Sequence, residues 1–84
     1  MISKDSIKNL LSFLETKYPS QFDSLESLKK SAPPNVNPDQ LFRLLYFCWE
    51  ENFIKCSPIE ESGNVVDFHG IRITSAGIRF LRGI

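Results

Sequence analysis

The feature that most constrains the fold is a change of periodicity after residue 52. Up to that point apolar residues recur at helical spacing, whereas FIKCSPI (53–59) and VVDFHGIRI (65–73) have the composition of extended strands. Between them lies EESGN (60–64), in which Ser62, Gly63 and Asn64 are turn-forming residues. The sequence therefore predicts one β-hairpin late in a chain that is otherwise helical, and hence an α+β fold.

The predicted hairpin is irregular. Pro58 cannot donate a hydrogen bond to a neighbouring strand, so we expect it at an outward-facing edge position. The apolar residues before Gly70 fall out of phase with Ile71 and Ile73 after it, which makes Gly70 a candidate β-bulge. We therefore expect the pairing register to change along the hairpin.

The stretch RITSAGIRFL (72–81) predicts a strand that leads into a short closing helix. Thr74 ends the strand and can cap the helix, and the missing side chain of Gly77 permits close backbone packing. The predicted inner face of this helix consists of Ile73, Gly77, Phe80, Leu81 and Ile84. The predicted outer face carries Ser75, Arg79 and Arg82.

The sharpest helix start in the chain is PPNVNPDQL (33–41). Asn37 is the expected N-cap, Pro38 the first helical residue and Gln40 the partner that completes a capping box. We expect this helix to run to about Asn52, with apolar residues around most of its circumference, as in a helix packed on more than one side. Its predicted open face consists of Gln40, Arg43, Phe47, Glu50 and Glu51.

Two shorter helices are predicted before it. Ser3 can cap the first, which Pro19 ends. Its apolar stripe is Ile7, Leu10, Leu11, Leu14 and Tyr18. Phe22 could anchor a very short strand, and Asp23 and Glu26 then have capping-box spacing for a brief second helix. The basic residues near the end of that helix are Lys29 and Lys30.

The composition suits one small domain over residues 1–84, which could be part of a longer protein. Of its 84 residues 42% are hydrophobic and 12% aromatic, enough for a single core without a metal or disulfide staple. Ten basic residues balance ten acidic ones, so no long-range field attracts polyanions, and nucleic-acid binding would depend on local patches.

The cysteine usage and hydropathy indicate a cytoplasmic protein without a membrane anchor. Cys48 and Cys56 fall in apolar stretches and lack the density of a secreted disulfide scaffold, so we expect reduced core thiols. The longest apolar run, LLYFCW (44–49), is too short to cross a bilayer.

The order helix, short strand, helix, helix, hairpin, terminal helix resembles the winged-helix variety of helix-turn-helix domain. ENFIKC (51–56) looks like the family's passage from the third helix into the first wing strand, and RITSAGIRFL resembles the strand-Thr-x-x-Gly-helix closure of small prokaryotic and phage members. The resemblance implies a three-helix bundle with a β-hairpin wing and a short C-terminal helix. The linker SAPPNV (31–36) is longer than the family's usual tight turn, and the wing tip carries Glu60 and Glu61 where DNA binders often have basic residues.

The resemblance further implies a regulator that binds double-stranded DNA, with the third helix in the major groove and the wing beside a phosphate backbone. The residues that this carries over are Asn35, Gln40 and Arg43, supported by Lys29 and Lys30. Arg43 has the chemistry to bind guanine and Gln40 to bind adenine. However, residues 50–67 hold five acidic residues against Lys55 alone, which opposes contact with phosphates. The alternative for Gln40 and Arg43 is a merely solvated polar face.

Two further features are candidate interaction sites. Arg72, Arg79 and Arg82 form a possible basic patch for phosphate or an acidic partner, although arginines near a helix C-terminus also complement the helix dipole. Phe47, beside charged residues of the same helix face, is a possible interface anchor, or else covers the wing or the first helix. The alternative function is therefore protein interaction, as a homodimer or with another protein, without DNA binding.

The sequence carries no constellation that predicts an enzyme. His69 is the only histidine and has no evident activating partner. With Cys48 and Cys56 it would provide at most three ligands, without the CxxC clustering of a zinc site. We therefore expect no catalysis, no metal and no cofactor.

Overall fold

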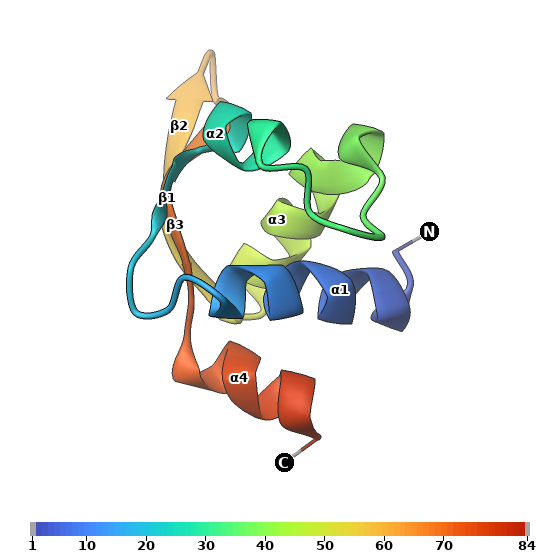
Figure 1. Ribbon diagram of the computed structural model, residues 1–84. Helices are drawn as coiled ribbons and strands as arrows, with labels where there is room; N and C mark the ends of the chain where they lie inside the picture. The colour runs from blue at the N-terminus through green and yellow to red at the C-terminus, as the bar shows by residue number, and fades with distance from the viewer. Residues whose placement is uncertain (1, 84) are drawn as a thin grey trace.

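The computed structural model describes residues 2–83, which form four α-helices, one 3₁₀ turn and a three-stranded antiparallel sheet (Figure 1). The elements follow in the order α1 (Lys4–Glu15), β1 (Phe22–Ser24), α2 (Leu25–Lys30), η1 (Pro38–Gln40), α3 (Leu41–Glu50), β2 (Ile54–Glu61), β3 (Asn64–Ile73) and α4 (Ser75–Arg82). The strand order is β1-β3-β2, so β3 is central. The predicted α+β class and the single late hairpin are confirmed.

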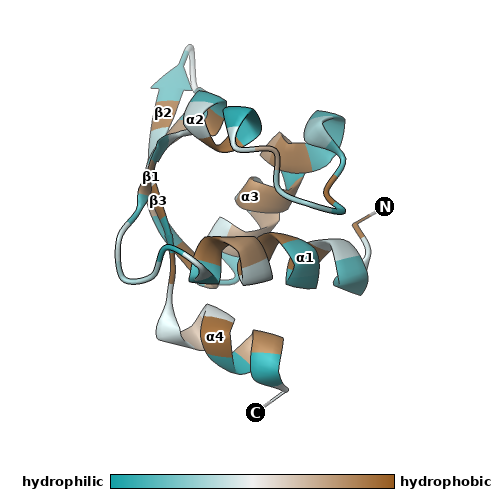
Figure 2. Ribbon diagram, viewed as in Figure 1, coloured by the Kyte–Doolittle hydropathy of each residue, from teal (hydrophilic) through white to brown (hydrophobic). Residues whose placement is uncertain are grey.

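The core lies between the sheet and the helices α1 to α3, which are on one side of it in Figure 1. Both α1 and α3 place apolar residues three and four positions apart, so each buries one continuous face (Figure 2). The buried residues of these two helices are Ile7, Leu10, Leu11, Leu14, Leu41, Leu44, Leu45 and Cys48. The strands contribute Phe22, Ile54, Phe68, Ile71 and Ile73.

The hairpin has the tight turn that its sequence predicts. Ser62 and Gly63 form the connection between β2 and β3, and both have positive φ angles, of 52° and 82°. Such a two-residue turn matches the right-handed twist of the paired strands. Pro58 lies on β2, an outer strand of the sheet, which confirms its predicted edge position.

The predicted bulge at Gly70 is also confirmed. The Cα partners on either side of it are Lys55 with Arg72 and Ser57 with His69. One residue of β2 is therefore opposite two residues of β3, and Gly70 adopts the left-handed φ of +63°. A side chain is unfavourable in that conformation, which explains the glycine.

The closing helix α4 is attached as the Thr74 and Gly77 pattern predicts. The Thr74 hydroxyl oxygen accepts a hydrogen bond from the backbone N–H of Gly77 at 3.1 Å and donates one to the Asn52 carbonyl at 2.7 Å. The backbone N–H of Thr74 donates to the Phe53 carbonyl at 2.9 Å. A Cβ at position 77 would clash with that same carbonyl and stand 2.8 Å from Cγ1 of Ile73. Ile84, predicted on the inner face, lies outside the described residues.

Two predicted helix starts differ from the structure. Ser24, not Asp23, caps α2 by accepting a hydrogen bond from the Ser27 N–H at 3.1 Å, because Asp23 is still held extended in β1. Asn37 is a cap as predicted, but its side chain accepts from the Asp39 N–H at 2.9 Å in a 3₁₀ turn, in place of a capping box with Gln40.

Two predicted helix ends also differ. The third helix ends at Glu50 and not at Asn52, whose φ of +63° turns the chain toward β2. Tyr18 does not extend the stripe of α1, because the helix ends at Glu15 and the chain then turns back on itself. Tyr18 is 44% exposed as a result.

Candidate functional site

A shallow groove of about 230 Å³ runs along the outer face of α3. It is lined by Ile2, Phe42, Arg43, Tyr46, Phe47 and Glu50. Arg43 and Glu50 are exposed, and the other residues that line the groove are half-buried. Positions three, four and seven apart share one helix face, so the groove is an apolar strip with a cation at its N-terminal end and an anion at its C-terminal end.

The floor of this groove is held by aromatic packing. The ring centroid of the fully buried Phe68 lies 5.4 Å from that of Phe42 and 6.2 Å from those of Tyr46 and Trp49. Edge-on and offset contacts at these distances are favourable beyond simple burial. The central strand therefore fixes the orientation of α3, and the groove is formed without a partner.

Phe47 lies where the helix periodicity places it. It shares the groove with Arg43 and Glu50, is half-buried and packs against the core cluster. Part of its ring thus contributes to the fold, and part lines a surface that another molecule can reach.

The five residues proposed for DNA contact are all exposed. They are Lys29, Lys30, Asn35, Gln40 and Arg43. The backbone carbonyl of Asn35 accepts a hydrogen bond from Nδ2 of Asn9 at 3.2 Å, which ties the long linker to α1. Among the five, Arg43 alone lines the α3 groove.

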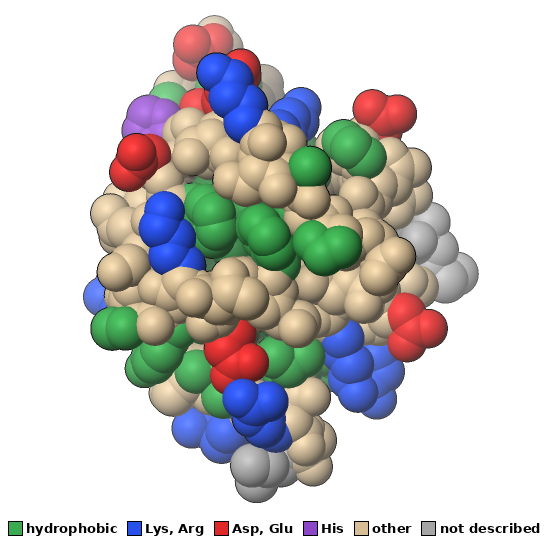
Figure 3. All heavy atoms as spheres, in the orientation of Figure 1, with side chains coloured by type: hydrophobic (Ala, Val, Ile, Leu, Met, Phe, Trp, Pro, Cys, Tyr) green, Lys and Arg blue, Asp and Glu red, His purple; other side chains and the backbone are tan. Residues whose placement is uncertain are grey.

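The possible basic patch of Arg72, Arg79 and Arg82 is divided between β3 and α4. Nη2 of Arg82 forms an ion pair of 2.6 Å with Oε2 of Glu15 on α1, which joins the two helices. Arg79 is exposed on α4, and Arg72 lies on β3. Figure 3 shows basic side chains dispersed over the visible face with acidic ones among them.

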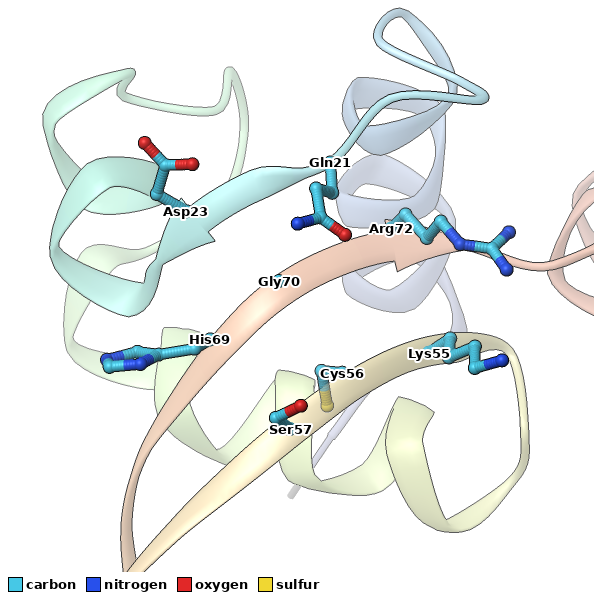
Figure 4. A pocket seen from close by; sticks show the side chains of 8 residues that line it. All are labelled: Gln21, Asp23, Lys55, Cys56, Ser57, His69, Gly70 and Arg72. Atoms are coloured by element: carbon cyan, nitrogen blue, oxygen red, sulfur yellow. The ribbon is translucent and has the colours of Figure 1, made fainter.

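A second, larger hollow lies on the outer face of the sheet (Figure 4). Its volume is about 570 Å³, and its polar lining is formed by Gln21, Asp23, Lys55, Ser57, His69 and Arg72. Lys55 and Arg72 extend toward the same end of the sheet, whereas His69 points to the other end (Figure 4). There its Nε2 lies 3.3 Å from Oδ2 of Asp67.

The sequence did not predict this hollow. Lys55 and Arg72 could each be assigned to the outer face by alternation, but their pairing depends on the bulge between them and the turn. Only the register of the folded hairpin places the two cations opposite each other.

The two cysteines are free thiols with different surroundings. Cys48 is buried in the core, and that burial, together with the nearby Glu51 carboxylate, raises its pKa to about 12. Cys56 is half-buried beside the sheet hollow, and burial raises its pKa to about 11. Both thiols are therefore protonated at neutral pH, which disfavours nucleophilic chemistry.

The described part of the chain has neither a cluster of metal-binding side chains nor a membrane-spanning helix. Residues 2–83 contain no group of three or more His, Cys, Asp or Glu side chains placed to hold a metal ion. No helix in that range has the length and apolarity needed to span a membrane.

Comparisons with protein-family models, with curated proteins and with solved structures give no match to this chain.

Proposed function

We propose that the chain is a winged-helix-type domain that functions in protein association, in which the outer face of α3 pairs with the same face of a second copy. The element order and the β1-β3-β2 sheet are compatible with a winged-helix arrangement. The proposed role in protein association rests on the α3 groove, an apolar strip bounded by Arg43 and Glu50.

The arrangement of charge on this groove is self-complementary. Arg43 and Glu50 are seven residues apart, which is about 10 Å along an α-helix. If two α3 helices pack antiparallel about a two-fold axis near positions 46 and 47, Arg43 of each copy lies opposite Glu50 of the other. A two-fold interface requires this property, because each contact is made twice with the roles exchanged. A parallel pairing would instead place like charges together.

The apolar part of the groove would supply most of the affinity. Aromatic side chains and arginine are enriched among residues that dominate protein interfaces. Phe42 and Tyr46 are held by their contacts with Phe68, and Phe47 lines the groove beside them. The surface of one ten-residue helix is nevertheless small beside the ~800 Å² per partner of a stable complex. We therefore expect a weak dimer, with a dissociation constant on the order of 100 µM.

Analytical ultracentrifugation across concentrations of about 10 µM to 1 mM tests this proposal, since that range brackets the expected constant. The average mass should rise from the monomer value of 9.6 kDa toward twice that value. Arg43→Glu and Glu50→Arg should each leave a monomer, and the double variant carrying both changes should dimerise again. Lys30→Glu and Glu61→Arg, which change exposed charges outside the groove, are matched controls and should behave as the unaltered chain does.

A monomer at every concentration would refute self-association. Dimerisation that survives both single charge reversals would place the interface elsewhere and refute the role of α3.

DNA binding is the second candidate function, favoured by the exposure of Lys29, Lys30, Gln40 and Arg43 on and before the start of α3. In a winged-helix domain these side chains would approach the major groove and its flanking phosphates. The acidic residues Glu60 and Glu61 at the hairpin tip oppose it, because they would face the backbone that a wing normally contacts.

Titration of a labelled random-sequence duplex at low salt distinguishes the two functions. Binding that weakens steeply with salt and is lost in Arg43→Ala supports DNA recognition. The same duplex should then also dissociate any dimer, because both uses require Arg43. If no duplex binds at millimolar protein, DNA binding is refuted and protein association is the remaining candidate function.

A further inference from the structure

We propose that the hollow on the outer face of the sheet is a binding site for a small phosphate monoester, with Lys55 and Arg72 holding the phosphate. This site is on different elements from the α3 groove, and the inference does not depend on the association proposed above.

The first support is an unfavourable charge arrangement. Lys55 on β2 and Arg72 on β3 are direct cross-strand partners. Like charges in such positions repel each other and destabilise a sheet. Within residues 2–83 neither Lys55 nor Arg72 has a carboxylate within salt-bridge distance, so neither member of the cross-strand pair is neutralised. A bound dianion between the two side chains would remove the repulsion.

The second support is the shape of the hollow. Its volume of about 570 Å³ falls within the usual range for small-molecule sites. The bulge at Gly70 leaves part of the floor without a side chain, and the amide group of Gln21 lies 3.4 Å from the position that a Cβ there would occupy. The amide of Gln21 and the hydroxyl of Ser57 also line the hollow and can donate hydrogen bonds, Gln21 next to Gly70 and Ser57 opposite His69 (Figure 4).

The chemistry of the two ends selects the class of ligand. The guanidinium of Arg72 can bind two phosphate oxygens at once, and the ammonium of Lys55 adds a compact positive charge. Asp23 and His69 line the rest of the hollow, and the Asp67 carboxylate lies 3.3 Å from His69; carboxylates accept hydrogen bonds from hydroxyl groups and repel a second anion. A ligand with one phosphate group attached to a hydroxylated molecule suits this asymmetry. A nucleic-acid backbone does not, because it carries a phosphate at every nucleotide.

Nuclear magnetic resonance titration of the whole chain tests the site, with inorganic phosphate and glycerol 3-phosphate as probes and sodium chloride at equal ionic strength as the control. Both probes should shift the backbone amides of Lys55, Gly70 and Arg72 saturably, and the ester should bind more tightly than inorganic phosphate. Arg72→Gln and Lys55→Gln should each weaken binding by on the order of 10-fold, since each removes one charge-assisted contact. Lys29→Gln, which removes an equivalent exposed charge from α2, should not alter it.

A second variant gives a readout independent of ligand contacts. Lys55→Glu replaces the cross-strand repulsion with attraction, so it should raise the melting temperature in the absence of phosphate and abolish the additional stabilisation by phosphate. Shifts that sodium chloride reproduces, or that persist unchanged in Arg72→Gln, would overturn the proposal. The proposal would also be overturned if phosphate stabilised the Lys55→Glu variant as strongly as it stabilises the unaltered chain.

Discussion

Replacing Gly77 with alanine should destabilise the domain, although alanine is the better helix former. Within α4 the substitution gains up to about 1 kcal/mol of intrinsic helix propensity. The added methyl group would clash with the backbone carbonyl of Phe53 and stand 2.8 Å from Cγ1 of Ile73. Overpacking of this kind costs about 1–3 kcal/mol. A backbone carbonyl cannot rotate away as a side chain can, so α4 must move.

That movement would also disturb the attachment of the helix. The Phe53 carbonyl accepts the 2.9 Å hydrogen bond from the Thr74 N–H, and such a bond contributes about 1 kcal/mol. We expect a net loss of about 1–3 kcal/mol, which lowers the melting temperature by roughly 10 °C in a domain of this size.

Urea unfolding followed by circular dichroism measures this loss. Ser75→Ala, at an exposed position of the same helix, is the control and should change stability by less than about 0.5 kcal/mol. A Gly77→Ala variant as stable as the unaltered chain, or more stable, would refute the argument that close backbone contact requires glycine here.

Three other changes test the account. Thr74→Ala should cost about 1–2 kcal/mol because it removes the cap of α4 together with the 2.7 Å bond to the Asn52 carbonyl, and Thr74→Ser should restore most of the loss in the same unfolding assay. Phe68→Ala should lower the free energy of unfolding by about 3–5 kcal/mol, because it removes the ring around which the α3 aromatics pack. A loss of less than half that size would contradict a central role of Phe68 in the core. Iodoacetamide at pH 8 should alkylate Cys56 about 100-fold more slowly in the folded chain than in urea, because folding raises the pKa of this thiol from 9.0 to about 11. Cys48 should react more slowly still. Mass spectrometry measures the alkylation rates, and equal rates in both states would contradict this prediction.

Much of the architecture could be predicted because its determinants are local. The cap at Thr74, the two-residue turn at Ser62 and Gly63, and the edge position of Pro58 each follow from the chemistry of one or two neighbouring residues. The bulge at Gly70 followed from a change in apolar phase within a single strand.

The features that were missed depend on residues distant in the sequence. The ion pair of Arg82 with Glu15 joins positions 67 residues apart, and no periodicity of either helix encodes it. The opposition of Lys55 and Arg72 depends on the turn and the bulge together. The spacing of Asp23 and Glu26 predicts a cap of α2 at Asp23, whereas pairing with β3 continues the strand to Ser24, which is the cap.

The central functional claim is that two copies meet through antiparallel α3 helices. Isotope-filtered nuclear Overhauser spectroscopy on an equimolar mixture of labelled and unlabelled chains, at a concentration where the dimer is populated, tests it most directly. We predict intermolecular contacts from the Phe47 ring to the Phe47 and Tyr46 rings of the other copy, together with contacts between Arg43 and Glu50 across the interface. Intermolecular contacts that map to the hairpin or to α4, with none from α3, would contradict the claim.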